Sequence, residues 1–325
     1  MILLYFLLLV VGFFALIKGA DWFVDGSVGI ARIFRIPGVI IGLTIVALGT
    51  SAPELAVSTS AALMGSNEIA LSNVVGSNIF NLLSVLGVCA VIHPVPVDKA
   101  ILKRDFPISI LATVFILIAS CFSTIYTGLF KTAGMNDIVG NVSRVIGITL
   151  LIFFVCYIVS LVINARKNKT EDEEETKVSV GKSILLILVG IALIVVGGQA
   201  VVTSAKAIAR IFGMSETLIG LTIVAVGTSL PELVTSIVAA RKGETGLAVG
   251  NAVGSNIFNL LFILGVSTSI HAVSVNMASM CDLIILIIIT AITYIFAFTK
   301  KEISRVEGIT MLLIYVADVV FAIYR

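Results

Sequence analysis

Two glutamates lie within long apolar stretches of this chain, each in a short motif rich in oxygen-bearing side chains. Glu54 closes the motif GTSAPE, and Glu232 closes the motif GTSLPE. An ionised carboxylate at the centre of a membrane-spanning helix costs about 2.5 to 3.5 kcal/mol on insertion scales, so an unused pair is not expected. Oxygen ligands suit hard cations such as Ca2+ or Na+, whereas His and Cys, which suit Zn2+ or Cu, are missing from both motifs. These residues therefore predict a site for a hard metal ion.

Helical spacing places the polar residues of each motif on common faces. Positions i, i+3, i+4 and i+7 share one face of a helix, and positions i, i+4 and i+8 also stack. The first pattern is occupied by Ala47, Thr50, Ser51 and Glu54 and again by Ala225, Thr228, Ser229 and Glu232. The second, in NVVGSNIFN and NAVGSNIFN, is occupied by Asn73, Ser77 and Asn81 and by Asn251, Ser255 and Asn259. If the four segments converge, they form a cage of carboxylate, hydroxyl, amide and carbonyl oxygens.

A proline precedes each glutamate. Pro53 and Pro231 lack a backbone N–H, and a proline ring clashes with the carbonyl four residues earlier in a helix. We therefore expect each helix to bend or break at its motif. Carbonyls freed at membrane depth are tolerated where they are buried in protein or line a cavity, so a broken helix would add oxygen ligands of its own.

The two motif pairs belong to an internal repeat. Residues 41–87 align without gaps with residues 219–265 at an offset of 178, and 30 of the 47 positions are identical. Duplicated intramembrane polar motifs are typical of transporters whose site lies where two repeats meet. The small residues Gly42, Gly65, Gly76 and Gly87 are expected to let helices approach closely.

Composition places the whole chain in a bilayer. It is 59% hydrophobic and 12% charged, with a mean hydropathy of +1.17, which leaves too little polar surface for a soluble domain. The net charge of +2 is spread over short loops and predicts no nucleic-acid partner. The four cysteines form no CxxC pair and are expected to pack rather than bind metal. No obligate protein partner and no cofactor are expected, only the transported ions and the lipid bilayer.

We predict an all-α polytopic membrane protein with ten transmembrane helices. A span needs about 20 apolar residues. The ten candidate spans are residues 2–27, 38–64, 69–93, 105–125, 146–165, 182–208, 216–240, 245–270, 281–299 and 306–324. Because five spans per half is an odd number, the halves must be inverted repeats, with broken helices at the centre. The predicted first repeat is 1–165, followed by a cytoplasmic acidic linker, 166–181, and the second repeat, 182–325.

The orientation follows from the basic residues. Most Lys and Arg of the loops follow the first, third, fifth, seventh and ninth spans, and basic loops stay in the cytoplasm. Both termini are therefore predicted to be extracytoplasmic, in a multi-pass protein of the cell (plasma or inner) membrane. The N-terminal stretch is interpreted as the first span rather than a signal peptide.

The paired motifs resemble the two α-repeats of the cation/Ca2+ exchanger superfamily, most closely those of the prokaryotic Na+/Ca2+ exchangers. The likeness extends over essentially the whole chain. It implies a central Ca2+ site formed by the two glutamates and the threonine carbonyls, and Na+ sites that share the glutamates. Carried over residue by residue, the implied ligands are Ala47, Thr50, Ser51, Glu54, Ser77, Asn81, Ala225, Thr228, Ser229, Glu232, Ser255 and Asn259.

The resemblance also indicates the coupling ions. K+-dependent exchangers, and some archaeal relatives, have an aspartate at the position of Asn259, so asparagine there argues against K+ transport. The Ca2+/H+ branch usually has a GNxxE-type motif where this chain has GTSxPE, which favours Na+. We therefore expect a secondary active antiporter, not an enzyme, that exchanges Na+ for Ca2+ by alternating access without K+. We also expect the first and sixth spans to slide against the rest.

Other functions remain open at this stage. A Ca2+/H+ antiporter would use the same glutamates as proton carriers and would respond to pH rather than to Na+. A cation channel would show ion flux without a counter-ion. An intramembrane enzyme would need a nucleophile with a base or a catalytic aspartate pair, which the motifs lack, and a Ca2+ sensor would not need two mirrored halves.

Overall fold

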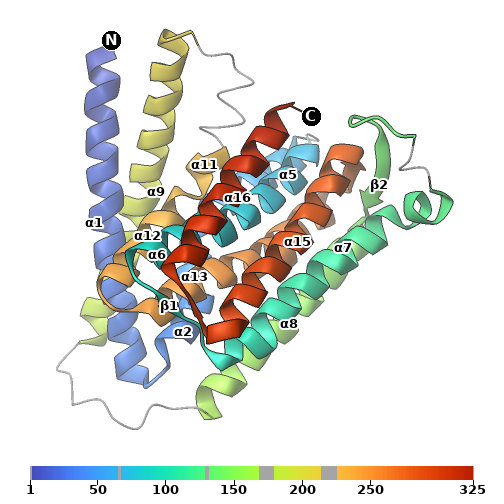
Figure 1. The fold of residues 1–325 in the computed structure, drawn as a ribbon. Coiled ribbons are helices and arrows are strands. Elements are labelled where there is room, and N and C mark those ends of the chain that lie inside the picture. The colour runs from blue at the N-terminus through green and yellow to red at the C-terminus, as the bar shows by residue number, and fades with distance from the viewer. Residues whose placement is uncertain (1, 65–66, 129–131, 168–178, 214–224, 325) are drawn as a thin grey trace.

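The computed structural model describes residues 2–64, 67–128, 132–167, 179–213 and 225–324, which form a mostly helical fold (Figure 1). Within these ranges, eight helices are long and apolar enough to cross a membrane, or nine if one bent pair counts as a span. The protein is therefore an integral, multi-pass membrane protein. The predicted seventh span, 216–240, falls partly on residues 214–224, outside the described residues, as does most of the predicted linker 166–181.

The elements of the first half follow the predicted spans closely. In chain order they are α1 (Ile2–Phe34), α2 (Gly38–Ile41), the π-helical η1 (Gly42–Val46), α3 (Ala47–Thr50), α4 (Ala52–Leu63), α5 (Asn67–Phe80), the π-helical η2 (Asn81–Val85), α6 (Leu86–Ile92), β1 (Val95–Pro96), the π-helical η3 (Ile101–Asp105), α7 (Phe106–Thr127), β2 (Ile138–Val142) and α8 (Arg144–Lys167).

The second half has a similar order of elements, and its described elements include no counterpart of η3. Its described elements are α9 (Val180–Ile211), α11 (Ala225–Thr228), α12 (Leu230–Arg241), α13 (Thr245–Ile257), the π-helical η6 (Phe258–Ile263), α14 (Leu264–Ile270), β3 (Val273–Asn276), α15 (Met277–Lys300), β4 (Glu302–Ile303) and α16 (Arg305–Tyr324).

The fold is mostly helical, as the prediction of an all-α membrane protein requires, and its loops add two short antiparallel sheets that the prediction did not include. Strand β1 pairs with β4, and β2 pairs with β3. Each sheet joins a loop of the first half to a loop of the second, and the paired loops are both odd-numbered or both even-numbered in the predicted topology. Because loop backbone outside the helices needs hydrogen-bond partners, loops that meet at one membrane face can pair as strands.

The centre of the fold consists of the helices that carry the asparagine motifs. In the apolar 18-residue window of each span, 94% of the residues are buried for Thr245–Ile270 and 78% for Ile69–Ile92, whereas 11% are buried for α16. Small side chains permit this central position, since Gly250 of α13 and Gly42 of η1 approach each other closely. A Cβ on Gly42 would lie 2.6 Å from the Leu247 carbonyl oxygen. The repeat motifs thus lie in the core, and the other helices surround them.

The expectation that small motif residues serve close packing holds for two of four glycines. Gly42 is one, and Gly87 is the other, because a Cβ there would lie 3.1 Å from the Gly308 carbonyl oxygen. The expectation is wrong for Gly76, which has open space where a Cβ would stand. Gly65 lies outside the described residues.

Helices α1 and α9 form an antiparallel pair, and the N-terminal end of α1 and the C-terminal end of α9 extend beyond the other helices (Figure 1). Glycines at intervals of seven residues bring the two backbones together. A Cβ on Gly12 would lie 3.0 Å from the Gly197 carbonyl oxygen, and one on Gly19 would lie 2.9 Å from that of Gly190. Such close backbone approach without bulky side chains is typical of packed membrane helices. The first helix of each half is therefore paired with its counterpart.

Candidate ion-binding site

The two glutamates occupy equivalent places at the starts of α4 and α12. Each lies in the first turn of its helix, one residue after the proline, and each is fully buried. Proline suits this place because the first helical turn has no intrahelical partner for its N–H groups. Helices α3 and α4 meet at Ser51 with a bend of 49°. The equivalent junction of α11 and α12 lies at Ser229.

The serines at these junctions bind the glutamate of the opposite half. Ser51 Oγ donates to Glu232 Oε1 at 2.8 Å, and Ser229 Oγ donates to Glu54 Oε1 at 3.0 Å. Both serines and both glutamates are fully buried. A hydrogen bond to a buried carboxylate is stronger than one between neutral groups. These two bonds therefore join the halves of the chain at the carboxylates themselves.

Each half also supplies one serine that lies close to the glutamate of the same half. Ser77 Oγ lies 3.3 Å from Glu54 Oε1, and Ser255 Oγ lies 3.5 Å from Glu232 Oε1. Ser77 is also 2.8 Å from Ser229. The hydroxyls thus gather on the Oε1 atoms, whereas Oε2 of both glutamates is buried without a hydrogen-bond partner. A buried oxygen left without a donor is costly unless a ligand satisfies it.

Two asparagines of the motifs support the backbone beside the glutamates. Asn73 Nδ2 donates to the Glu54 carbonyl oxygen at 3.4 Å and to Ser58 Oγ at 2.9 Å. In the second half, the side chain of Asn251 donates to the Glu232 carbonyl oxygen and to Ser236 Oγ at 3.3 and 2.9 Å. Thr50 Oγ1 lies 3.0 Å from Asn251 Oδ1. The asparagine bonds to the glutamate carbonyls and to the serines are related by the offset of 178, so the structure preserves the internal repeat at these contacts. The contact of Thr50 is not repeated, because Oγ1 of the equivalent Thr228 has no hydrogen-bond partner.

The remaining predicted ligands are placed as follows. Asn81 begins η2 and Asn259 lies in η6, and both are fully buried. Both amide atoms of Asn81 and Oδ1 of Asn259 have no hydrogen-bond partner, and the half-buried Thr228 leaves its Oγ1 free in the same way. Ala47 is buried at the start of α3, and Ala225 begins α11.

Two asparagines that the sequence analysis did not select as ligands take part in the same network. Asn78 Nδ2 donates to the Asn256 carbonyl oxygen, and Asn256 Nδ2 donates to the Asn78 carbonyl oxygen, both at 3.2 Å. Their helical face differs from that of Ser77 and Asn81, so periodicity assigned them no role. The signal that could have found them is the full repetition of SNIFN in both halves.

The chemistry of the cluster is that of a hard-cation site. It contains two carboxylates, several hydroxyls and several amides, and the described contacts of Glu54 and Glu232 include no Lys, Arg or His. In the part of the chain that the structure describes, no group of three His, Cys, Asp or Glu residues could hold a metal. A cluster of two negative charges and neutral oxygens suits Ca2+ or Na+ rather than Zn2+.

Comparison with known proteins agrees with this chemistry. The family model of the sodium/calcium exchanger protein matches residues 4–163 and 182–324. Sodium/calcium exchanger MaX1 of Methanosarcina acetivorans is 35% identical, with 100% of both chains covered. Membrane protein MJ0091 of Methanocaldococcus jannaschii is also 35% identical, over 96% of this chain and 95% of its own.

A solved structure supports the same relationship. The sodium-calcium exchanger NCX_Mj, in a crystal soaked with Na+ and Sr2+, matches with a TM-score of 0.82 and 33% identity, over 98% of this chain and 99% of that one. Sequence and fold agree over nearly the full length, so the relationship extends to the transport function of the family, cation/Ca2+ antiport by a secondary transporter and not an enzyme. This chain therefore belongs to the sodium/calcium exchanger family.

Proposed function

We propose that this protein exchanges Na+ for Ca2+ by alternating access, without K+. The observation that carries the proposal is the pair of fully buried glutamates whose Oε2 atoms have no hydrogen-bond partner. Their Oε1 atoms are held by hydroxyls from both halves, which leaves the second oxygen of each carboxylate for an ion. One Ca2+ or two Na+ would neutralise the pair.

Charge makes the exchange obligatory in this account. Two carboxylates without a cation are costly in a low-dielectric interior, and closing the site from both sides would remove the water that stabilises them. A carrier without bound ions should therefore not change its orientation. Ca2+ in one direction and Na+ in the other allow the change, which gives exchange rather than uniport.

We propose as ligands the twelve residues that match the family motif. The two carboxylates and the carbonyls of Thr50 and Thr228 would form the Ca2+ site, and the serines, asparagines and alanine carbonyls would complete the Na+ sites. Burial of all these side chains but Thr228, among those the structure describes, supports the assignment. Asparagine at position 259 leaves two carboxylates in the cage, and this supports exchange that does not need K+.

The proposed topology has ten spans in two inverted five-helix repeats, 1–165 and 182–325, joined by a cytoplasmic linker, 166–181. The second and seventh spans would be the broken central helices. The 49° bend at Ser51 and the contacts related by the offset of 178 support this arrangement. The loop pairs β1–β4 and β2–β3 support it as well, because each pair joins loops on the same predicted side. Both termini would lie outside a plasma or inner membrane.

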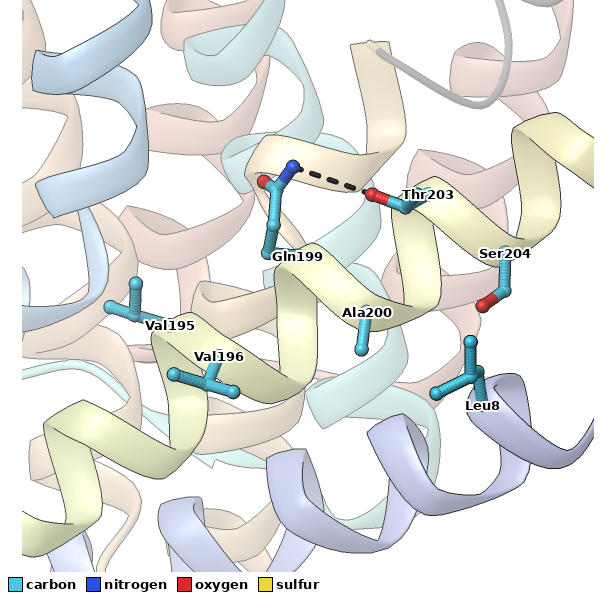
Figure 2. A pocket seen from close by; sticks show the side chains of 7 residues that line it. All are labelled: Leu8, Val195, Val196, Gln199, Ala200, Thr203 and Ser204. Carbon is cyan, nitrogen blue, oxygen red and sulfur yellow. Dashed lines mark hydrogen bonds between the residues drawn. The ribbon is translucent and has the colours of Figure 1, made fainter. Parts of the chain in front are cut away.

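We propose that α1 and α9 move together as the sliding element. On the predicted cytoplasmic side, Lys242, directly after α12, lies 2.5 Å from Asp21 Oδ1 and 2.7 Å from Asp25 Oδ1 of α1. Figure 2 shows the related positions on α9, where Gln199 and Thr203 stand in place of the two aspartates. Those two side chains are exposed and hydrogen-bonded to each other at 3.4 Å. The ion pairs of Lys242 support a conformation in which α1 is closed against the core on the predicted cytoplasmic side.

Gradient-driven Ca2+ uptake into proteoliposomes tests the proposal. Na+-loaded vesicles are diluted into Na+-free, K+-containing or pH-shifted buffer, with Glu54→Gln and Glu232→Gln beside the parent. We expect uptake that requires the outward Na+ gradient, ignores K+ and is lost in either variant. Uptake that follows the pH gradient regardless of Na+ would instead identify a Ca2+/H+ antiporter, and uptake without any counter-ion would identify a channel.

A further inference from the structure

The amide of Asn259 is held by an interaction that its counterpart Asn81 lacks. Asn259 Nδ2 donates to Asn78 Oδ1 at 3.0 Å and to Ser77 Oγ at 3.2 Å. Neither amide atom of Asn81 has a partner. The two asparagines stand at equivalent positions of the repeat, so this difference breaks the internal symmetry of the site at one specific contact.

A backbone carbonyl determines the orientation of both amides. Asn78 Nδ2 donates to the Asn256 carbonyl oxygen at 3.2 Å, and a carbonyl can only accept. Asn78 must therefore turn its nitrogen toward Asn256 and its Oδ1 toward Asn259. Asn259 must in turn present its nitrogen to Asn78 Oδ1, which leaves its own Oδ1 directed elsewhere. That Oδ1 is fully buried and has no hydrogen-bond partner.

We propose that Asn78 is a positioning residue that holds the Asn259 carbonyl oxygen ready to bind Na+. The inference rests on the proposed function, in which Asn259 is a Na+ ligand. Asn78 does not contact the ion in this account. It acts by fixing the amide of Asn259, so that the free oxygen is supplied without a side-chain rotation when the ion binds.

The same geometry explains why asparagine rather than aspartate suits position 259 in this chain. A carboxylate has no N–H to donate, so an aspartate there would place an acceptor against Asn78 Oδ1, which is itself an acceptor. The orientation of Asn78 is fixed by the Asn256 carbonyl and cannot reverse without losing that bond. Asn78 thus favours a neutral ligand at position 259 and a cage with two carboxylates.

A thermodynamic cycle tests the role of Asn78. Na+-dependent Ca2+ uptake is measured for the parent, Asn78→Ala, Asn259→Ala and the double variant. Removing the partner that orients an ion ligand commonly lowers metal affinity 10- to 100-fold. We expect Asn78→Ala to raise the half-saturating Na+ concentration about tenfold, at the low end of that range, because Asn259 is one of several ligands. The half-saturating Ca2+ concentration should stay unchanged, and Asn78→Ala should have no further effect when Asn259 is already replaced by alanine.

Asn256→Ala is the matched control. It removes the equivalent bond to a backbone carbonyl but no bond to a candidate ligand. Its effect, whatever the size, should be as large in the Asn259→Ala background as in the parent. Na+-induced thermal stabilisation of the purified variants gives a second reading that does not need transport.

The outcomes separate this inference from the proposed function. A parent protein without Na+-dependent Ca2+ uptake or Na+-induced stabilisation would overturn both. If the parent exchanges Na+ for Ca2+, the inference about Asn78 is overturned by an unchanged Na+ half-saturation in Asn78→Ala, by an equal change for Ca2+, or by an effect that persists in full without Asn259.

Discussion

The hydrogen bonds from each junction serine, Ser51 and Ser229, to the glutamate of the opposite half give a prediction that distance along the sequence would not suggest. Ser51 stands three residues before Glu54, yet its hydroxyl donates to Glu232 at 2.8 Å. We therefore expect Ser51→Ala to act on ion binding through the glutamate of the opposite half. Hydrogen bonds to charged groups contribute about 1.5 to 3 kcal/mol. A bound cation replaces part of this interaction, so we take about 1.5 kcal/mol, which corresponds to about a tenfold rise in the half-saturating Ca2+ concentration.

The partner is identified by combining Ser51→Ala with a shortened glutamate. Glu232→Asp keeps the charge but withdraws the carboxylate by one carbon–carbon bond, about 1.5 Å, which takes it beyond hydrogen-bonding distance of Ser51. In that background Ser51→Ala should have little further effect, which corresponds to a coupling of about 1.5 kcal/mol. Glu54→Asp is the matched control, because no described contact joins Ser51 to Glu54, and the coupling there should stay below about 0.5 kcal/mol.

The assay is Na+-driven Ca2+ uptake into proteoliposomes over a range of external Ca2+ concentrations, with protein orientation and amount matched between variants. Additive effects of Ser51→Ala and Glu232→Asp, or an equal coupling of Ser51 to Glu54, would refute the reasoning. Either result would mean that the hydroxyl does not orient the carboxylate of the other half.

Three further predictions follow from the packing, the ion pairs and ligand binding. Gly42→Ala should destabilise the protein by about 1 to 3 kcal/mol, because its Cβ would meet the backbone of α13, whereas Gly76→Ala should be tolerated; thermal unfolding in detergent compares them, and equal losses would contradict the packing. Lys242→Met should change the rate of exchange by a factor that stays the same from about pH 6 to 9. Burial lowers the pKa of Lys242, but hydrogen bonds to Asp21 and Asp25 raise it by more. The ion pairs therefore persist below the ordinary lysine pKa and are lost only as pH rises through the raised value. A ratio of rates that changes within that range would count against this contact. Ca2+ at 100 times its dissociation constant should stabilise the parent by about 2.7 kcal/mol, and Glu232→Gln should lose this stabilisation; a variant that responds like the parent would exclude the carboxylate from the site.

Sequence patterns predicted the positions of the helices and the bend before Glu54 because both depend on local rules. Apolar stretches of span length located the helices, and the proline before Glu54 explained the bend of 49° at Ser51. Family relationship and antiport were predicted from the motifs and are confirmed by the comparisons. The assignment of individual ligands stays a prediction.

Other features depend on which segments meet in space, and the sequence could not supply them. Helical periodicity grouped Ser51 with Glu54 on one face, but the carboxylate that it binds comes from a segment 181 residues away. The loop strands and the open surroundings of Gly76 likewise result from how the halves approach each other. Asn259 donates hydrogen bonds through its amide nitrogen, whereas the amide of Asn81 has no hydrogen-bond partner. The sequence could not predict this difference, because the two motifs are identical there.

Competition between Na+ and Ca2+ for the purified protein tests the central claim most directly. Calorimetric titration of Ca2+ is repeated at rising Na+ concentration, with K+ at equal ionic strength as the control. If both ions use the oxygens of Glu54 and Glu232, Na+ should displace Ca2+ competitively, K+ should not, and Glu54→Gln or Glu232→Gln should bind neither. Simultaneous binding of Ca2+ and Na+ at saturation, or unchanged Ca2+ binding in either glutamine variant, would contradict a shared two-carboxylate cage.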